Sequence, residues 1–267
     1  MFDAIVVPID DGPDSRRALD TAVLLARAWL APVQLVTVVS PGVDRGEAER
    51  WLADALDDLD APARAPIVVA SNDIAEALRA LVGDSALLCM ATHARTAIGD
   101  LVLGSTARSV VSGATAPLVL VGPRCAPKGG FDSIVVPIRP GSGFSARAAS
   151  VATAWATDLG ARIELVGAVS AEERMLVGDD EAGAELEALA AAARHEGVDA
   201  SWHIVPGDDI ADRVLEVAAD RSSSLLVVAT HARRPIARLA LGSVAQAITR
   251  KATCPVLVVP PGVARPS

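Results

Sequence analysis

The strongest constraint on the fold is that the chain repeats itself. FDAIVVPI at Phe2 returns as FDSIVVPI at Phe131. Four more segments recur in the same order, and the offset grows from 129 to 138 residues, so the second copy carries small insertions. Repeats of this kind indicate duplicated structural units. We therefore expect a first domain over residues 1–123, a short linker over 124–130 and a second domain over 131–267.

Within each copy, short apolar runs alternate with segments of helical periodicity. In the first copy the predicted strands are 5–9, 33–39, 65–70, 86–91 and 117–121. The predicted helices are 15–30, capped by Asp14 or Ser15 and with an apolar face from Leu19 to Leu30, then 47–59, 73–82 and 105–113. Strands that are apolar on both faces are typical of parallel sheets between two helix layers. The predicted fold class is α/β, with two similar open five-stranded parallel sheets flanked by helices.

The fifth strands, PLVLV at Pro117 and PVLVV at Pro255, are short and apolar. Apolar edge strands associate when they are left unpaired. We therefore expect the two sheets to pair with each other through their fifth strands.

The net charge of −9 argues against a nucleic-acid partner, because such proteins usually present a basic face. No apolar stretch reaches the roughly 20 residues that a membrane helix needs. The cysteines, Cys89, Cys125 and Cys254, are odd in number and form no CxxC pair. These features predict a cytoplasmic protein with reduced thiols and no membrane segment.

The motif ATHARTAIGDLVLGSTA at Ala91 is nearly repeated by ATHARRPIARLALGSVA at Ala229. It runs from a strand end through a loop to a helix that begins at Gly104-Ser105, and at Gly242-Ser243 in the second copy. A helix N-terminus with free N–H groups binds anions. Plain capping by the serine is an equally good interpretation, since Ser243 and Gln246 fit a capping box.

The duplication, the IVVPID start and the G-x2-G-x9-G-[ST] spacing resemble tandem universal stress proteins over the whole chain. The resemblance implies a Rossmann-like fold, a homodimer and regulatory protein partners. It also implies adenine-nucleotide binding, such as ATP, in one branch of the family. There an aspartate and a valine hold the adenosine, and glycines with a final Ser or Thr hold the ribose and phosphates.

Matched to that pattern, the first copy carries Asp10, Val38, Gly104 and Ser105, but Ala91 and Ala94 replace glycines. The second copy keeps Gly242 and Ser243, but has Arg139 for the aspartate, Ala168 for the valine, and Ala229 and Ala232 for the glycines. Alanine costs about 1–2 kcal/mol where φ is positive. Elsewhere its Cβ intrudes on a close ligand. Two such changes weaken binding by on the order of tenfold to several hundredfold.

We therefore expect weak nucleotide binding at most in the first copy, and none by the family's mode in the second. Four arginines would surround the second pocket: Arg139, Arg233, Arg234 and Arg238. They suit phosphate or carboxylate, and the alternative is a solvated arginine-rich loop.

The sequence offers no recognised catalytic or metal-binding motif. HExxH, GxSxG, Walker and GxGxxG patterns are missing, and His93 and His231 have no partner at ligand spacing. Trp29, Trp51, Trp155 and Trp202 are expected in the core or at interfaces. The first hypothesis is a non-enzymatic stress-response regulator with degenerate nucleotide sites. The alternative is an ATP-binding switch in the first domain, and the third is an α/β hydrolase or nucleotidyl transferase.

Overall fold

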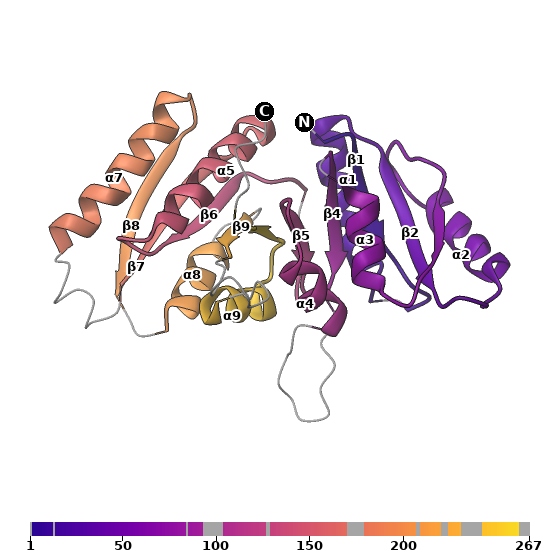
Figure 1. Cartoon of the computed structure of the whole chain (residues 1–267). Helices are drawn as coiled ribbons and strands as arrows, with labels where there is room; N and C mark the ends of the chain where they lie inside the picture. Colours follow the sequence, from indigo (N-terminus) through magenta and orange to yellow (C-terminus); the bar gives the residue numbers. More distant parts are fainter. Residues whose placement is uncertain are drawn as a thin grey trace.

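The computed structural model describes residues 2–12, 14–83, 85–92, 104–126, 129–169, 179–206, 209–219, 224–230 and 242–261. Strands and helices alternate through both copies (Figure 1). The first copy contains β1 (Ala4–Pro8), α1 (Arg17–Trp29), β2 (Val33–Val39), α2 (Arg45–Asp57), β3 (Ile67–Ala70), α3 (Ile74–Val82), β4 (Ala86–Ala91), α4 (Ser105–Ser112) and β5 (Leu118–Val121). The second contains β6 (Ser133–Ile138), α5 (Gly143–Leu159), β7 (Arg162–Val169), α7 (Asp179–His195), β8 (Ala200–Pro206), α8 (Ile210–Ala219), β9 (Ser224–Ala229), α9 (Ser243–Lys251) and β10 (Val256–Val259).

The described strands form one ten-stranded sheet with the order β3-β2-β1-β4-β5-β10-β9-β6-β7-β8. Pairing is parallel within each copy. Where the copies meet, β5 and β10 pair antiparallel, with Val119 opposite Leu257. The predicted fold class is confirmed, including the pairing through the fifth strands.

Helices cover both faces of this sheet. Most buried residues of α1, α2, α5 and α7 belong to the core on one face. Those of α3, α4, α8 and α9 belong to the core on the other face. Each core draws residues from both copies, for example Val119 and Leu257 on the first face and Leu120 and Val256 on the second. The two copies therefore share their hydrophobic cores across the β5–β10 junction.

An aromatic cluster joins the copies on the α1 side of the sheet. Trp29 of α1 and Trp155 of α5 meet edge to face, with ring centroids 4.7 Å apart. Phe2 lies 5.2 Å from Trp29 and 6.1 Å from Trp155 between the same centroids. Trp29 and Trp155 are buried, and the half-buried Trp51 and Trp202 pack against the same core. The expected core position of the tryptophans is confirmed.

The predicted cap of the first helix is wrong. Helix α1 begins at Arg17 with Arg16 as its N-cap, and no side chain bonds to its terminus. The Ser15 hydroxyl instead bonds to main-chain groups of the preceding loop, the N–H of Asp10 and the carbonyl of Gly12. A hydroxyl used in this way is not available to cap the helix. In α2 and α3, by contrast, Asp44 and Asp73 accept from the N–H groups of the first turn.

Leu30 departs from the predicted apolar face of the first helix. It is 86% exposed. It also ends α1 in the left-handed region, with φ 53°. Gly160 holds the corresponding C-cap after α5, with φ 65°. A side chain at this backbone geometry is strained, whereas glycine is not.

Replacing Leu30 by glycine is therefore expected to raise the free energy of unfolding by about 0.5–1 kcal/mol, since the relieved strain exceeds glycine's extra chain entropy. Urea unfolding followed by circular dichroism measures this gain. The matched control, Gly160→Leu, should lower stability by a similar amount. A loss of stability in Leu30→Gly would contradict the strain argument.

Candidate functional site

Each copy has a point where the chain changes its direction of travel across the sheet. In the first copy it lies between β1 and β4, which pair with Ile5 opposite Leu87. In the second copy it lies between β6 and β9, with Ile134 opposite Leu225. Ligands of open α/β sheets bind outside the carboxyl ends of the strands at such switch points. The repeated motif begins at the last residues of β4 and β9, so both candidate sites lie there.

Asp10 follows β1, and a buried serine holds its main chain. The Ser15 hydroxyl accepts from the Asp10 N–H at 3.1 Å. It also lies 3.1 Å from the Asp10 carbonyl and 2.8 Å from the Gly12 carbonyl. One oxygen of the Asp10 carboxylate accepts from the Gly12 N–H at 3.0 Å. Position 10 is thus fixed at the strand end.

The second copy anchors Arg139 in the same way. The Ser145 hydroxyl accepts from the Arg139 N–H at 3.0 Å and donates to its carbonyl at 3.0 Å. The sequence analysis assigned Ser15 to a helix cap and did not single out Ser145. Their signal was a serine that recurs seven residues after the end of the first strand of each copy.

Buried threonines anchor the start of the two motif loops. The Thr92 N–H donates to the carbonyl of Val121 at 2.8 Å, and the Thr230 N–H donates to that of Val259 at 2.9 Å. Each loop therefore leaves the sheet beside the end of its fifth strand.

The alanines that end β4 and β9 do not strain the backbone. Leu30 is the only non-glycine residue with positive φ in the described part of the chain, so Ala91 and Ala229 need no glycine for that reason. Ala91 is buried in the core on the α1 side, and the half-buried Ala229 packs against the same core. The cost of a positive φ therefore does not apply at these two positions. Ala94 and Ala232 lie outside the described residues.

Gly104 and Gly242 are the N-caps of α4 and α9. Their φ and ψ angles, −55° and 155°, and −58° and 160°, are open to any residue. What distinguishes a glycine at these positions is the missing Cβ, which lets a ligand approach the backbone closely. Ser105 and Ser243 are the first helical residues, and no side-chain cap is formed, so the capping-box interpretation is wrong.

Val38 lies on β2, which pairs with β1, and is half-buried. Asp10 thus follows β1, and Val38 and Ala91 lie in its two neighbouring strands, β2 and β4. Ala168, which replaces the valine, lies in β7.

The two loops after the first strands differ in charge. In the first copy Asp10 and Asp11 are exposed, and Asp14 pairs with Arg17 at 2.6 Å. In the second copy Arg139 is exposed, and the Arg147 guanidinium lies 5.8 Å from the Phe144 ring centroid. The loop arginines Arg233, Arg234 and Arg238, and His93 and His231, lie outside the described residues.

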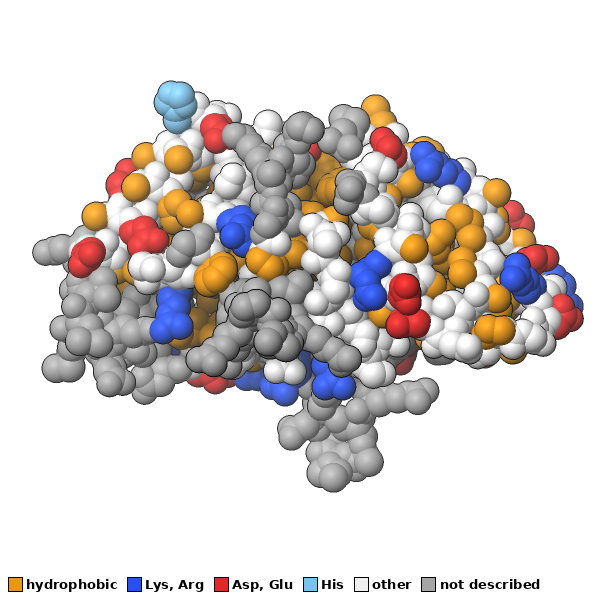
Figure 2. All heavy atoms as spheres, viewed as in Figure 1, with side chains coloured by type: hydrophobic (Ala, Val, Ile, Leu, Met, Phe, Trp, Pro, Cys, Tyr) orange, Lys and Arg blue, Asp and Glu red, His pale blue; other side chains and the backbone are white. Residues whose placement is uncertain are grey.

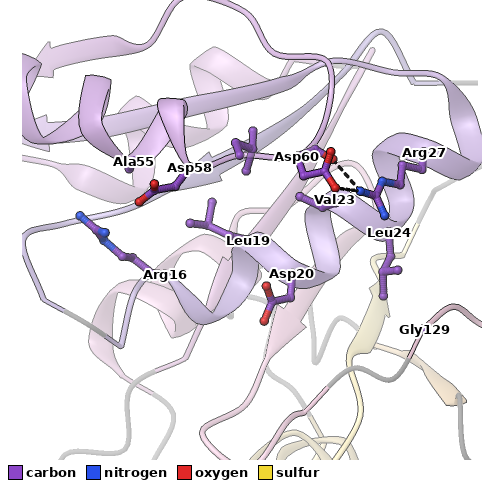
Figure 3. A pocket seen from close by; sticks show the side chains of 11 residues that line it. Arg16, Leu19, Asp20, Val23, Leu24, Arg27, Ala55, Asp58, Asp60 and Gly129 are labelled. Carbon is purple, nitrogen blue, oxygen red and sulfur yellow. Dashed lines mark hydrogen bonds and ion pairs between the residues drawn. The ribbon is translucent and has the colours of Figure 1, made fainter.

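A groove of about 480 Å³ runs along α1 and the end of α2, and Gly129 also lines it (Figure 3). Nothing in the sequence analysis predicted it. On the face drawn in Figure 2, acidic and basic side chains are interspersed, so the net charge of −9 is not gathered into one patch there.

The model of the universal stress protein family matches residues 1–122 and again residues 130–260. The chain belongs to the universal stress protein family. It carries the family unit twice, as the resemblance implied. No curated protein sequence shows significant similarity to it.

Solved structures share the fold of this tandem universal stress protein. One from Archaeoglobus fulgidus DSM 4304 is 14% identical, with a TM-score of 0.73 over 97% of this chain and 99% of that one. A functionally unknown protein from Pseudomonas aeruginosa PAO1 is 16% identical, with a TM-score of 0.73 over 97% and 93%. A universal stress protein from Archaeoglobus fulgidus in complex with dAMP covers 49% of this chain and 99% of its own, at 21% identity and a TM-score of 0.39.

Two features are absent from the residues that the structure describes. No helix there is long and apolar enough to cross a membrane. Nor do three or more His, Cys, Asp or Glu side chains in the described ranges gather as a metal site would require.

All three cysteines are free, and Cys89 and Cys254 are buried. Burial raises the pKa of the Cys254 thiol to about 12, and that of the half-buried Cys125 thiol to about 12. The pKa of Cys89 is raised further for the same reason. Few thiolates form at neutral pH, so the thiols are poor nucleophiles in the folded protein.

The raised thiol pKa values predict a loss of stability in alkali. The unfolded chain releases these protons near pH 8.5, whereas the folded chain keeps them to about pH 12. The contribution of the buried thiols to the free energy of unfolding is therefore complete below pH 8.5 and is lost as the pH rises. For Cys254 alone the loss is about 2 kcal/mol at pH 10. Urea midpoints between pH 7 and 10 measure the slope. The chain has no tyrosine to obscure it, and Cys254→Ala should reduce it. A slope unchanged in that variant would contradict the assignment.

Proposed function

We propose that this universal stress protein is a cytoplasmic, non-enzymatic stress-response regulator with two unequal ligand sites. One site lies in the domain of residues 1–123 and the other in the domain of residues 131–267, with 124–130 as the linker. The first site holds an adenine nucleotide weakly, and the second does not hold ATP in the family's mode. The occupied and empty states would be read by a protein partner.

The contrast between Asp10 and Arg139 carries this proposal. Buried serines hold both residues in the same way, so the scaffold is common to the copies and only the side chain differs. A carboxylate accepts hydrogen bonds from ribose or adenine, whereas a guanidinium only donates. The same position therefore favours a nucleoside in the first copy and an anion in the second.

Four residues of the first copy would hold the nucleotide. Asp10 and Val38 would contact the adenosine, and Gly104 with Ser105 would receive the phosphates at the α4 terminus. No side chain caps that terminus, so its N–H groups and dipole favour an anion. Asp10 and Asp11 add negative charge at the same end of the sheet, which weakens phosphate binding.

Calorimetric titration of the full chain with MgATP tests the proposal. We expect a Kd weaker than about 10 μM, because the alanine at position 94 and the nearby carboxylates reduce affinity. Ala91→Gly/Ala94→Gly should bind at least about tenfold more tightly. The matched pair in the second copy, Ala229→Gly/Ala232→Gly, should change nothing, since Arg139 remains. Sub-micromolar binding by the unaltered protein would contradict the proposal.

An ATP-binding switch in the first domain is the second candidate. One observation favours it: the Ala91 methyl lies in the core and its backbone is unstrained, so this alanine need not obstruct a ligand. The switch predicts sub-micromolar binding and a rise of several degrees in melting temperature with saturating MgATP. The same titration therefore separates the two candidates.

A further inference from the structure

A hydrogen bond ties the loop after β6 to helix α7. The Gly141 N–H donates to Oε2 of Glu185 at 2.6 Å, across a separation of 44 residues along the chain. Gly141 lies two residues after Arg139, which stands where the first copy has Asp10. The loop at the mouth of the second site is therefore bonded to a carboxylate that comes from another element.

The first copy forms the same kind of bond from within its own loop. There the Gly12 N–H donates to Oδ1 of Asp10 at 3.0 Å. Gly12 and Gly141 are equivalent, since each stands three residues after the isoleucine that ends the repeated IVVPI run. An arginine side chain only donates hydrogen bonds, so Arg139 cannot supply the acceptor. Each copy thus places a carboxylate on this glycine, and the second copy takes it from α7.

The change on α7 accompanies the change in the loop. Leu52 of α2 and Leu186 of α7 are fully buried in the same core, and each follows a buried alanine by four residues. These matched positions place Glu185 where the first copy has the half-buried Trp51. Where the loop of the second copy loses its carboxylate, the neighbouring helix therefore gains one.

We propose that Glu185 is an internal ligand that keeps phosphate out of the second site. Phosphate oxygens bind main-chain N–H groups and arginine, and Gly141 and Arg139 offer both within one loop. The carboxylate of Glu185 already holds that N–H. An incoming phosphate therefore loses a donor and meets a like charge. The inference rests on the proposed preference of the second copy for an anion.

The block is a competition between two anions and not a change of fold. Leu186, next to Glu185, is fully buried in the core, so α7 stays in place and only the Glu185 side chain has to move. Glu185 itself is half-buried and can turn toward solvent. The N-terminus of α9, which follows a strand of the same copy and has no side-chain cap, then offers further N–H donors. The second site is thus closed by its own chain and opens as the phosphate concentration rises.

Titration of the full chain with inorganic phosphate, followed through the Gly141 amide resonance by NMR, tests the competition. The unaltered protein should bind with a Kd weaker than about 1 mM. Glu185→Gln keeps the size of the side chain but removes its charge, and should bind at least about tenfold more tightly. The matched control is Glu181→Gln, which removes the same charge from an exposed position one turn earlier on α7 and should change the Kd by less than about twofold. Adding Arg139→Gln to Glu185→Gln should abolish the gain.

The Gly141 resonance also reports the contact without any ligand. It should shift in Glu185→Gln and stay in place in Glu181→Gln. A resonance that Glu185→Gln does not move, or phosphate binding that this variant does not strengthen, overturns the inference. A gain that persists with Arg139→Gln supports the role of Glu185 and contradicts that of Arg139 in the proposed function. The weak nucleotide binding proposed for the first copy fails by a different result, sub-micromolar binding of MgATP to the unaltered protein.

Discussion

Replacing Leu257 by aspartate is expected to lower the free energy of unfolding by at least about 4 kcal/mol, because a charge is buried without a partner and apolar contacts are lost. Leu257 is fully buried and lies opposite Val119 in the antiparallel pairing of β5 and β10. Sheet and core continue through this point from one copy to the other. The damage should therefore reach both copies.

Urea unfolding followed by far-ultraviolet circular dichroism measures the loss. Leu30→Asp makes the same chemical change at an exposed position and should cost nothing measurable. A loss below about 1 kcal/mol in Leu257→Asp would show that the junction between the copies contributes little.

Replacing Trp155 by alanine is expected to cost about 3–5 kcal/mol, the range for a large aromatic residue removed from a packed core. Trp155 is 1% exposed. It contacts Trp29 of the other copy edge to face at 4.7 Å between centroids. Such pairs add about 0.5–1.5 kcal/mol beyond the area they bury.

A double-mutant cycle with Trp29→Ala measures the coupling between the copies. The sum of the two single losses should exceed the loss in the double variant by about that amount. Trp51→Ala is the control, since Trp51 is half-buried and outside the cluster. Additive losses at Trp29 and Trp155 would mean that the aromatic cluster does not couple the two copies.

Both predictions concern the junction between the two copies. The boundaries of the two family units do not reveal how closely the copies are joined there. The family match divides the chain at residues 122–130. The two copies nevertheless share both cores, and their fifth strands are neighbours in one sheet. Variants at the junction should therefore lower the stability of the whole chain, and not that of one half.

At the candidate sites the sequence correctly predicted which strand end or helix start each residue occupies. It did not determine why each residue type stands there. Ala91 and Ala229 end strands, and Gly104 and Gly242 precede helices, as the motif spacing indicated. Two of the interpretations that the sequence left open are excluded. Ala91 has an ordinary backbone, and Ser105 does not cap its helix. Spacing places a residue on an element, but its φ angle and the acceptor of its hydroxyl depend on the path of the surrounding loop.

The sequence by itself determined the duplication, the alternation of strands and helices, and the pairing of the fifth strands. It could do so because buried parallel strands and apolar edge strands appear in the sequence as short runs of apolar residues. Only the tertiary structure decided the serine anchors at Asp10 and Arg139, the continuous cores and the groove beside α1. The groove exists because leucines on α1 face the end of α2, whereas alanines and threonines on α5 admit α7. Those contacts join residues more than thirty positions apart in the chain, such as Arg27 and Asp60. The local periodicity of the sequence does not predict contacts between segments so far apart.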